Sequence, residues 1–260
     1  MKTTGYLLAA ASIFLYTASF GQTPDFDRLA DSCFHSFAAN DTARFNRLYP
    51  RLTEAYEQKT DPEMYALRQE LLSMRNSDQG IRLLLLEARQ RFGPDSPTAA
   101  ALHAEMKRID TENARRVRML IDEHGWIGKE DLGEDANETL FLCIQHVDDL
   151  TIQEKYLPLL KQAVETGNAE GWHYAFLTDR IRMNRGEKQV YGTQTITRPN
   201  GEVYVVPLED PGKVDSLRRS IGLEPMAAYL GKTWNPETYK RDLPAIEQQY
   251  KAFTESRKMP

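Results

Sequence analysis

Apolar residues recur three and four positions apart along the first two thirds of the chain, which is the spacing of amphipathic helices. The clearest stripe runs through Phe26, Leu29, Cys33 and Phe37. A second helix, ending near Tyr56, is expected to kink at Pro50. The start signals for later helices are the N-cap and proline pairs Asp61-Pro62 and Ser96-Pro97, together with Ser77, where a new helix is expected to restart. Further helices are expected over 97–124, 135–148, 151–166 and 172–184.

The pattern changes after residue 188. Residues 189–208 are rich in β-branched and aromatic side chains around Pro199-Asn200-Gly201, which predicts a β-hairpin. Helical spacing returns over 211–221, 224–230 and 237–255. The predicted fold class is therefore mainly α (α+β), a multi-helix domain with an embedded β-hairpin near residues 189–208.

No linker, low-complexity tract or repeat separates these elements. The simplest organisation is a signal peptide over 1–21, N-terminal helices over 22–60 and an α-rich domain over 61–260 that is continuous with those helices. The alternative is a division of the chain at Gly93 to Pro97, where helix-breaking residues gather.

The N-terminus has the parts of a secretory signal peptide. Lys2 supplies a basic start, Tyr6 to Phe20 is mostly apolar, and small residues precede a cleavage point after Gly21. The apolar run is shorter than the roughly 20 residues that span a bilayer, which disfavours the alternative of a retained anchor. The sequence therefore predicts export to the periplasm or the extracellular space, with no membrane span after cleavage.

Composition excludes some classes of partner. The formal net charge of −5 gives no global attraction for nucleic acid or an anionic membrane. No nucleotide-binding, zinc-protease or hydrolase motif occurs, so no cofactor and no metal are expected. Cys33 and Cys143 are predicted either to form a disulfide, which export permits, or to be two buried thiols.

Several polar segments of the C-terminal half resemble a known family. They are Gly125-Trp126, Gln145-His146-x-Asp148, Tyr156-Leu157-Pro158-Leu159, Leu177-Thr178-Asp179-Arg180, Gln189-x-Tyr191-Gly192-Thr193-Gln194 and Arg218-Arg219-x-x-Gly222-Leu223. Together with Asp78-Gln79-x-x-Arg82 and Asp110-x-x-Asn113, they resemble the uncharacterised bacterial family called domain of unknown function 6624. The resemblance covers roughly residues 65–230. It implies a shared fold and no particular activity.

His146 is the candidate catalytic residue. In a helix over 135–148, the polar residues Gln145 and His146 follow an apolar run. His146 and Asp149 are three residues apart, which predicts that they share a helix face and that the carboxylate orients the imidazole as a general base. The alternative is a histidine that interacts only with the helix dipole near a C-terminus.

Asp179 and Arg180 are adjacent on a predicted helix, so each needs a partner from elsewhere. Together with Asp78, Arg82 and Asp110, they would form either a buried ionic network or a site where Arg82 and Arg180 hold an anion. In the hairpin, strand alternation would place Gln189, Tyr191 and Thr193 on one polar face. Gly192 would mark a bulge or a close backbone approach, which could bring Gln194 onto that face. The alternative is a polar face that simply meets water.

Two functions remain open from the sequence. The first is a binding or interaction module for an unknown small-molecule or protein ligand, with a polar pocket built from helix ends and the hairpin. The second is a hydrolase or transferase with His146 as general base and Arg82 or Arg180 stabilising an anion. The candidate binding residues are Asp78, Gln79, Arg82, Asp110, Asn113, Gln145, Asp179, Arg180, Gln189, Tyr191, Thr193 and Gln194. Arg218 and Arg219 are expected to form a solvated basic pair.

Overall fold

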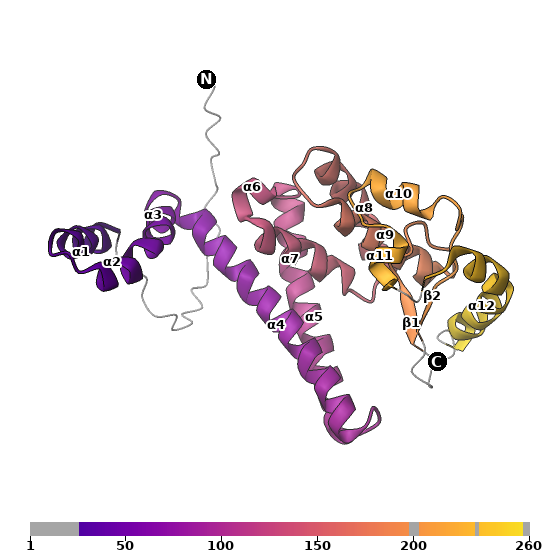
Figure 1. Ribbon diagram of the computed structural model, residues 1–260. Coiled ribbons are helices and arrows are strands. Elements are labelled where there is room, and N and C mark those ends of the chain that lie inside the picture. The colour runs from indigo at the N-terminus through magenta and orange to yellow at the C-terminus, as the bar shows by residue number, and fades with distance from the viewer. Residues whose placement is uncertain (1–25, 198–202, 232–233, 257–260) are drawn as a thin grey trace. The chain divides into compact units, whose positions relative to one another are not determined.

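A computed structural model describes residues 26–197, 203–231 and 234–256 (Figure 1). The predicted signal peptide and the hairpin turn at Pro199-Asn200-Gly201 lie outside the described residues. The structure is mainly α with one small antiparallel hairpin, which confirms the predicted fold class. The chain divides into two compact units, and the boundary falls between Tyr65 and Ala66.

The first unit is made of short helices. They are α1 (Phe26–Ala38), α2 (Thr42–Leu48), the 3₁₀ helix η1 (Tyr49–Arg51) and α3 (Leu52–Thr60). Leu29, Cys33 and Ala55 form its buried apolar positions. The predicted kink at Pro50 is a complete 3₁₀ turn between two separate helices, because proline removes one backbone donor from the helical ladder.

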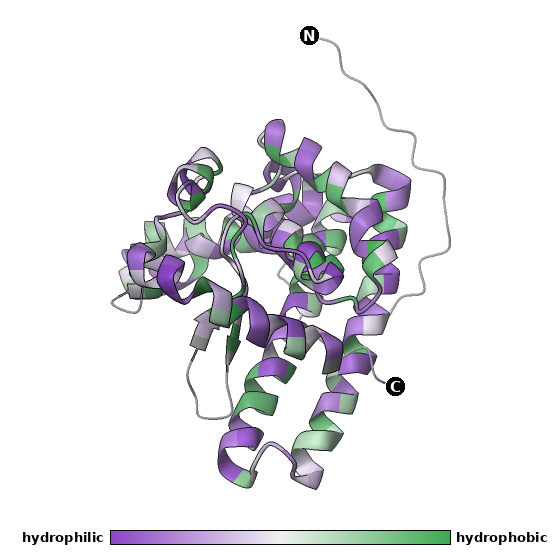
Figure 2. Ribbon diagram, turned by 90° about the vertical axis from the view of Figure 1, so that its right-hand side faces the viewer, coloured by the Kyte–Doolittle hydropathy of each residue, from purple (hydrophilic) through white to green (hydrophobic). Residues whose placement is uncertain are grey.

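The long helices α4 (Pro62–Phe92) and α5 (Pro97–His124) run antiparallel, joined by a tight turn at Gly93. Figure 2 shows apolar and polar residues interspersed along both helices. The predicted restart at Ser77 is wrong, because α4 continues through it. The Ser77 hydroxyl donates to the carbonyl of Met74 in the preceding turn and caps nothing. Ser96, in contrast, accepts from the Ala99 backbone N–H and caps α5 as predicted.

The second unit is centred on α7 (Glu134–Gln145), which packs against α5, α8 (Leu150–Glu165) and α9 (Gly171–Arg185), with the short α6 (Lys129–Leu132) before it. Every residue from Thr139 to Gln145 is buried, so α7 has no solvent-facing stripe over that length. Its C-terminal end, at Gln145, therefore brings polar side chains into the interior of the unit.

The C-terminal part contains the hairpin and three helices. Strands β1 (Thr195–Thr197) and β2 (Val203–Val205) pair antiparallel and precede α10 (Val214–Ser220), α11 (Met226–Leu230) and α12 (Pro236–Ser256). The predicted hairpin is too long, because residues 189–194 form a loop in which Gln189 makes a single isolated bridge to Leu208. The predicted alternation of side chains over 189–195 therefore does not occur.

Gly192 marks a close backbone approach, as the sequence predicts, although it lies in a loop and not in a strand. Its φ is +70°, a conformation that suits glycine, and a Cβ atom there would lie 2.8 Å from the sulfur of Met226. The close approach is therefore to a buried methionine of α11.

Within the described residues, no helix combines the length and apolar character needed to cross a membrane. Cys33 and Cys143 are free thiols, and each is buried in its own unit. The structure therefore supports two buried thiols and not a disulfide between them.

Candidate functional site

The centre of the candidate site is a pair of charged residues one turn apart on α4. Asp78 is only 1% exposed, although it carries a carboxylate. One terminal nitrogen of Arg82 lies 3.0 Å from Asp78 Oδ1 and donates to the Asp78 backbone carbonyl at 2.9 Å. The four-residue spacing places both groups on one helix face.

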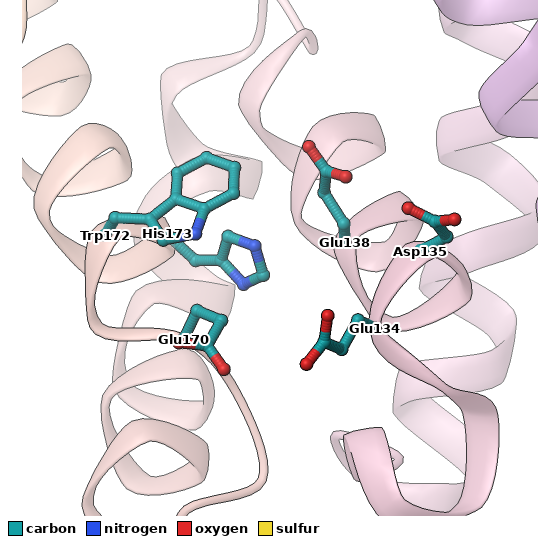
Figure 3. A pocket seen from close by; sticks show the side chains of 6 residues that line it. All are labelled: Glu134, Asp135, Glu138, Glu170, Trp172 and His173. Atoms are coloured by element: carbon teal, nitrogen blue, oxygen red, sulfur yellow. The ribbon is translucent and has the colours of Figure 1, made fainter.

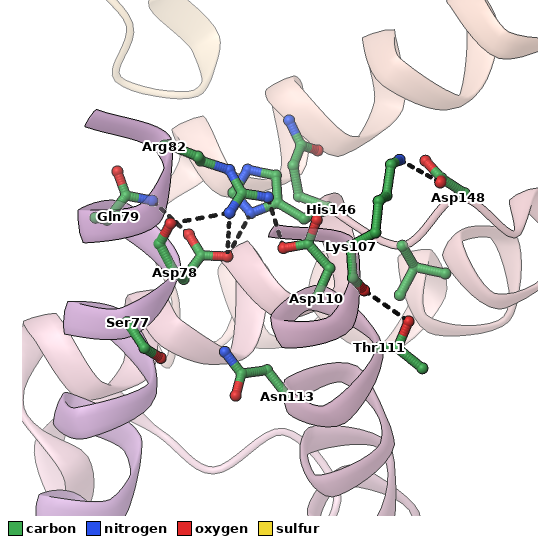
Figure 4. Close-up of polar contacts among 12 residues, drawn as sticks. Ser77, Asp78, Gln79, Arg82, Lys107, Asp110, Thr111, Asn113, His146 and Asp148 are labelled. Atoms are coloured by element: carbon green, nitrogen blue, oxygen red, sulfur yellow. Dashed lines mark hydrogen bonds and ion pairs between the residues drawn. The ribbon is translucent and has the colours of Figure 1, made fainter. Parts of the chain in front are cut away.

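The neighbouring helix α5 adds a second buried carboxylate. The other terminal nitrogen of Arg82 donates to Asp110 Oδ1 at 2.7 Å, and Asp110 is 6% exposed. Figure 4 shows the guanidinium between the two carboxylates. A planar guanidinium with five donors can serve two acceptors in this way, which a lysine could not do with the same geometry.

The third contribution comes from the end of α7. His146 is the C-cap residue of this helix, and its Nδ1 lies 2.9 Å from Asp78 Oδ1. The other oxygen of Asp78 accepts from the Gln79 side-chain amide at 2.6 Å. We refer to Asp78, Arg82, Asp110 and His146 as the polar cluster. The sequence places these four residues on three helices, and the structure brings them together.

Two opposed effects act on the pKa of Asp78. Burial is the largest influence and raises the pKa, but the hydrogen bond and charge of His146, the charge of Arg82 and the amide of Gln79 together outweigh it. The pKa of Asp78 is therefore lowered, and the carboxylate stays ionised. One turn before His146, burial strongly raises the pKa of the Cys143 thiol, so this group is not a thiolate nucleophile.

The predicted pairing of His146 with Asp149 is wrong. Helix α7 ends at Gln145, so the two residues do not share a helix face. The Gln153 side chain donates to the carbonyls of Gln145 and Val147 and stabilises this helix end. Asp149 is instead the N-cap of α8 and accepts from the Thr151 backbone N–H. The carboxylate that orients His146 is Asp78.

Asn113 of α5 and Gln145 of α7 are both buried, on helices that contribute to the polar cluster. The Asn113 amide donates to the Met74 carbonyl at 3.5 Å, which ties α5 to α4. Gln145 is 4% exposed, and its side-chain oxygen has no hydrogen-bond partner within the described part of the chain. The Gln145 side-chain oxygen is therefore a buried acceptor that could receive a further hydrogen bond.

The other predicted residues form a separate group around Asp179 of α9. Asp179 is fully buried and accepts from the backbone N–H groups of Val190, Tyr191 and Thr193 and from the Thr193 hydroxyl. Burial raises the pKa of Asp179, and these donors oppose that effect. The 189–194 loop is thus wrapped around one carboxylate, and Asp179 is not part of the polar cluster.

Gln189 and Gln194 stabilise the same loop from inside. The Gln189 amide donates to the carbonyls of Gln194 and Val206, and its oxygen accepts from the Gln194 backbone N–H. The Gln194 amide donates to the Thr193 hydroxyl oxygen. These buried side chains bond to protein groups, so the predicted polar face is not presented to water. Arg180, beside Asp179 on α9, is partly buried, and its proposed role toward an anion stays a prediction.

Arg218 is a residue that the sequence analysis assigned wrongly. It is 1% exposed rather than solvated, because it donates to the carbonyls of Glu224 and Tyr191 and stacks on the ring of Tyr229. Its neighbour Arg219 is exposed, as expected for the pair. The signal that could have identified Arg218 was its place in one of the segments that resemble the family.

A cation other than Arg82 would have three ligand atoms available in the polar cluster. Single atoms of Asp78, Asp110 and His146 all lie within 4.8 Å of one another. The Arg82 guanidinium already pairs with both carboxylates, however, so a metal ion would have to displace it from each of them. The geometry therefore favours an ionic network over a metal centre.

Comparison with known proteins adds the family. No curated protein and no solved structure matches the chain at a significant level. A family model described as "family of unknown function (DUF6624)" matches residues 65–237, a region that includes the polar cluster and the 189–194 loop. The chain therefore belongs to the family of unknown function DUF6624.

Proposed function

We propose that this chain is an exported binding module, and that a polar ligand contacts the Nε2 atom of His146. The observation that carries the proposal is the bond between His146 Nδ1 and the buried Asp78 carboxylate. A neutral histidine that donates through Nδ1 keeps Nε2 as a hydrogen-bond acceptor. Nε2 has no partner within the described residues, and the side chain of His146 is 17% exposed. A ligand donor is the natural partner for this atom.

The charges of the polar cluster indicate what kind of ligand fits. Two carboxylates, Asp78 and Asp110, share one guanidinium, so the cluster has no excess positive charge whether the imidazole of His146 is neutral or protonated. This arrangement disfavours the predicted role of Arg82 in holding an anion, because its charge is already used inside the protein. We therefore infer a neutral ligand that offers hydroxyl or amide donors, such as a glycan or a peptide.

The proposal is tested by NMR spectroscopy of the His146 ring nitrogens. Histidine ¹⁵N resonances of the full mature chain would be recorded during titration with N-acetylated sugars and short neutral peptides. A ligand that binds as proposed shifts the Nε2 resonance of His146, and binding weakens about tenfold or more in a His146→Gln variant, as expected for loss of a good hydrogen bond in a shielded site. Asp148→Asn is the matched control, because Asp148 is exposed and its ion pair is with Lys107.

Binding that is equally strong in His146→Gln and in the wild type would refute this role for His146. So would a panel in which no ligand moves the His146 resonances while the protein remains folded by circular dichroism.

Export is the second part of the proposal and rests on the N-terminal sequence. The basic start, short apolar run and small residues before Gln22 support cleavage after Gly21. We expect the full-length protein, expressed in a bacterial host, to be recovered outside the cytoplasm as a chain that begins at Gln22, as read by intact-mass measurement. Recovery of a chain that still carries the apolar segment would contradict this.

The second candidate function is a hydrolase or transferase, which the same Asp78–His146 pair favours. A carboxylate that fixes one ring nitrogen while the other remains available is the arrangement that general bases use. A turnover assay separates the two functions, because loss of a general base lowers kcat by roughly 10²–10⁴. Binding without turnover supports the module, whereas turnover that disappears in His146→Gln supports the enzyme.

A further inference from the structure

A second candidate site lies at the other end of α7, near its first turn. A cavity of about 330 Å³ is lined by Glu134, Asp135 and Glu138 of α7 and by Glu170, Trp172 and His173 at the start of α9 (Figure 3). This volume is at the lower end of small-molecule pockets. None of these residues belongs to the polar cluster or to the segments that resemble the family.

His173 is the most unusual residue of this cavity. It is 1% exposed, yet neither ring nitrogen has a hydrogen-bond partner within the described residues. The ring stacks on Phe141, with centroids 4.6 Å apart and planes 11° apart, and Trp172 contacts it edge-on. Figure 3 shows the imidazole directed from α9 toward the glutamates of α7. Buried polar atoms in native proteins are normally bonded, so these two nitrogens indicate a missing partner.

The charge of the lining indicates the nature of that partner. Four carboxylates face two cations, since Arg75 pairs with Glu138 and lies near Asp135, and Lys129 pairs with Glu170. Glu134 is exposed and forms no ion pair among the described residues. The cavity thus has an excess of negative charge beside an indole and an imidazole, a combination that attracts organic cations.

We propose that this cavity binds a small organic cation with an ammonium or guanidinium group. The cation donates a hydrogen bond to a ring nitrogen of His173, its charge is balanced by Glu134, and its aliphatic part packs on Trp172. Burial favours the neutral imidazole and lowers its pKa to about 4, an effect that Glu170 opposes and Lys129 reinforces. A neutral ring offers one acceptor and one donor, so it can receive the N–H of a cation.

A metal ion fits this cavity less well. Among the described residues, the group whose carboxylate and imidazole atoms come within 4.8 Å of one another is the polar cluster, not the lining of this cavity. Zinc or magnesium would therefore require the side chains around His173 to move together, whereas a cation several atoms long can contact side chains that lie apart.

Isothermal titration of the full mature chain with agmatine tests the proposal, since this probe carries a guanidinium and an amine at opposite ends. We expect one saturable site that His173→Phe and Glu134→Gln each weaken about tenfold or more. His173→Phe keeps the stacking on Phe141 and removes only the nitrogens. Asp95→Asn, in the exposed turn before α5, is the matched control and should bind like the wild type.

Two further arms make the result specific. The neutral diol 1,4-butanediol should not bind, and His146→Gln should leave agmatine binding unchanged, which separates this site from the polar cluster. The proposal is overturned if agmatine gives no saturable heat, if both cavity variants bind as well as the wild type, or if the diol binds equally. It is also overturned if zinc or magnesium alone binds in a His173-dependent way while agmatine does not.

Discussion

Replacement of Asp179 by alanine is expected to lower the free energy of unfolding by about 4 kcal/mol, because it removes one acceptor from several buried donors at once. Asp179 is fully buried, and three backbone N–H groups and one hydroxyl of the 189–194 loop donate to its two oxygens. Each donor left without a partner costs about 1–3 kcal/mol in desolvation. Urea unfolding followed by circular dichroism measures the difference.

Two variants show whether the effect comes from the carboxylate. Asp179→Asn keeps one acceptor oxygen but places an amide N–H₂ against other donors, so its loss is expected to lie between that of alanine and the wild type. Asp95→Asn removes an exposed charge and should change little. A loss below about 1 kcal/mol in Asp179→Ala would mean that water replaces the carboxylate, and that the loop does not depend on it.

The charge of Asp179 is compensated at a distance. Arg218 donates to the Tyr191 carbonyl, while the Tyr191 N–H donates to Asp179, so a buried cation and a buried anion act on one residue of the loop. The charge of Asp179 in turn opposes the lowering of the Arg218 pKa that burial causes. The conspicuous polar segment Gln-x-Tyr-Gly-Thr-Gln is therefore explained by internal hydrogen bonds that fix a loop without regular secondary structure.

Local signals were sufficient for most of the helices. Ser96-Pro97 predicts the start of α5 because a side-chain cap and a proline at N1 are properties of neighbouring residues. The end of α7 was missed because it depends on Gln153, whose side chain reaches the carbonyls of Gln145 and Val147 from another helix. The continuity of α4 through Ser77 was missed for a similar reason, since Asp78 and Ile81 are buried there by tertiary packing.

The sequence indicates the residues of the polar cluster but does not predict which of them contact one another. The spacing of Asp78 and Arg82 is visible in the sequence, because i, i+4 neighbours meet on any helix. The bond from His146 to Asp78 joins residues 68 positions apart, so no local pattern contains it. The sequence predicts Asp149 instead, because a residue three positions after His146 shares its face of a helix. His173 gave no signal at all, because its surroundings come from another helix, α7.

Stability below neutral pH should depend strongly on His173. Its pKa is about 4 in the folded protein, against about 6.5 for an ordinary histidine. Between these values the unfolded chain binds one more proton at this residue, so its contribution to stability is complete above pH 6.5 and is lost as pH falls toward 4. The expected loss from this residue is about 3 kcal/mol between pH 7 and pH 4, at roughly 1.4 kcal/mol per pH unit. Urea unfolding at several pH values in amine-free buffer measures it.

A second series with His173→Phe isolates the contribution, since other groups titrate over the same range. The difference in unfolding free energy between the variant and the wild type should move by about 3 kcal/mol in favour of the variant as the pH falls from 7 to 4. His103→Gln, which changes an exposed histidine, should run parallel to the wild type throughout. Parallel curves for His173→Phe and the wild type would mean that the ring is protonated in the folded protein. In that state the imidazole offers donors only, and the cavity between α7 and α9 would no longer present an acceptor to a bound cation.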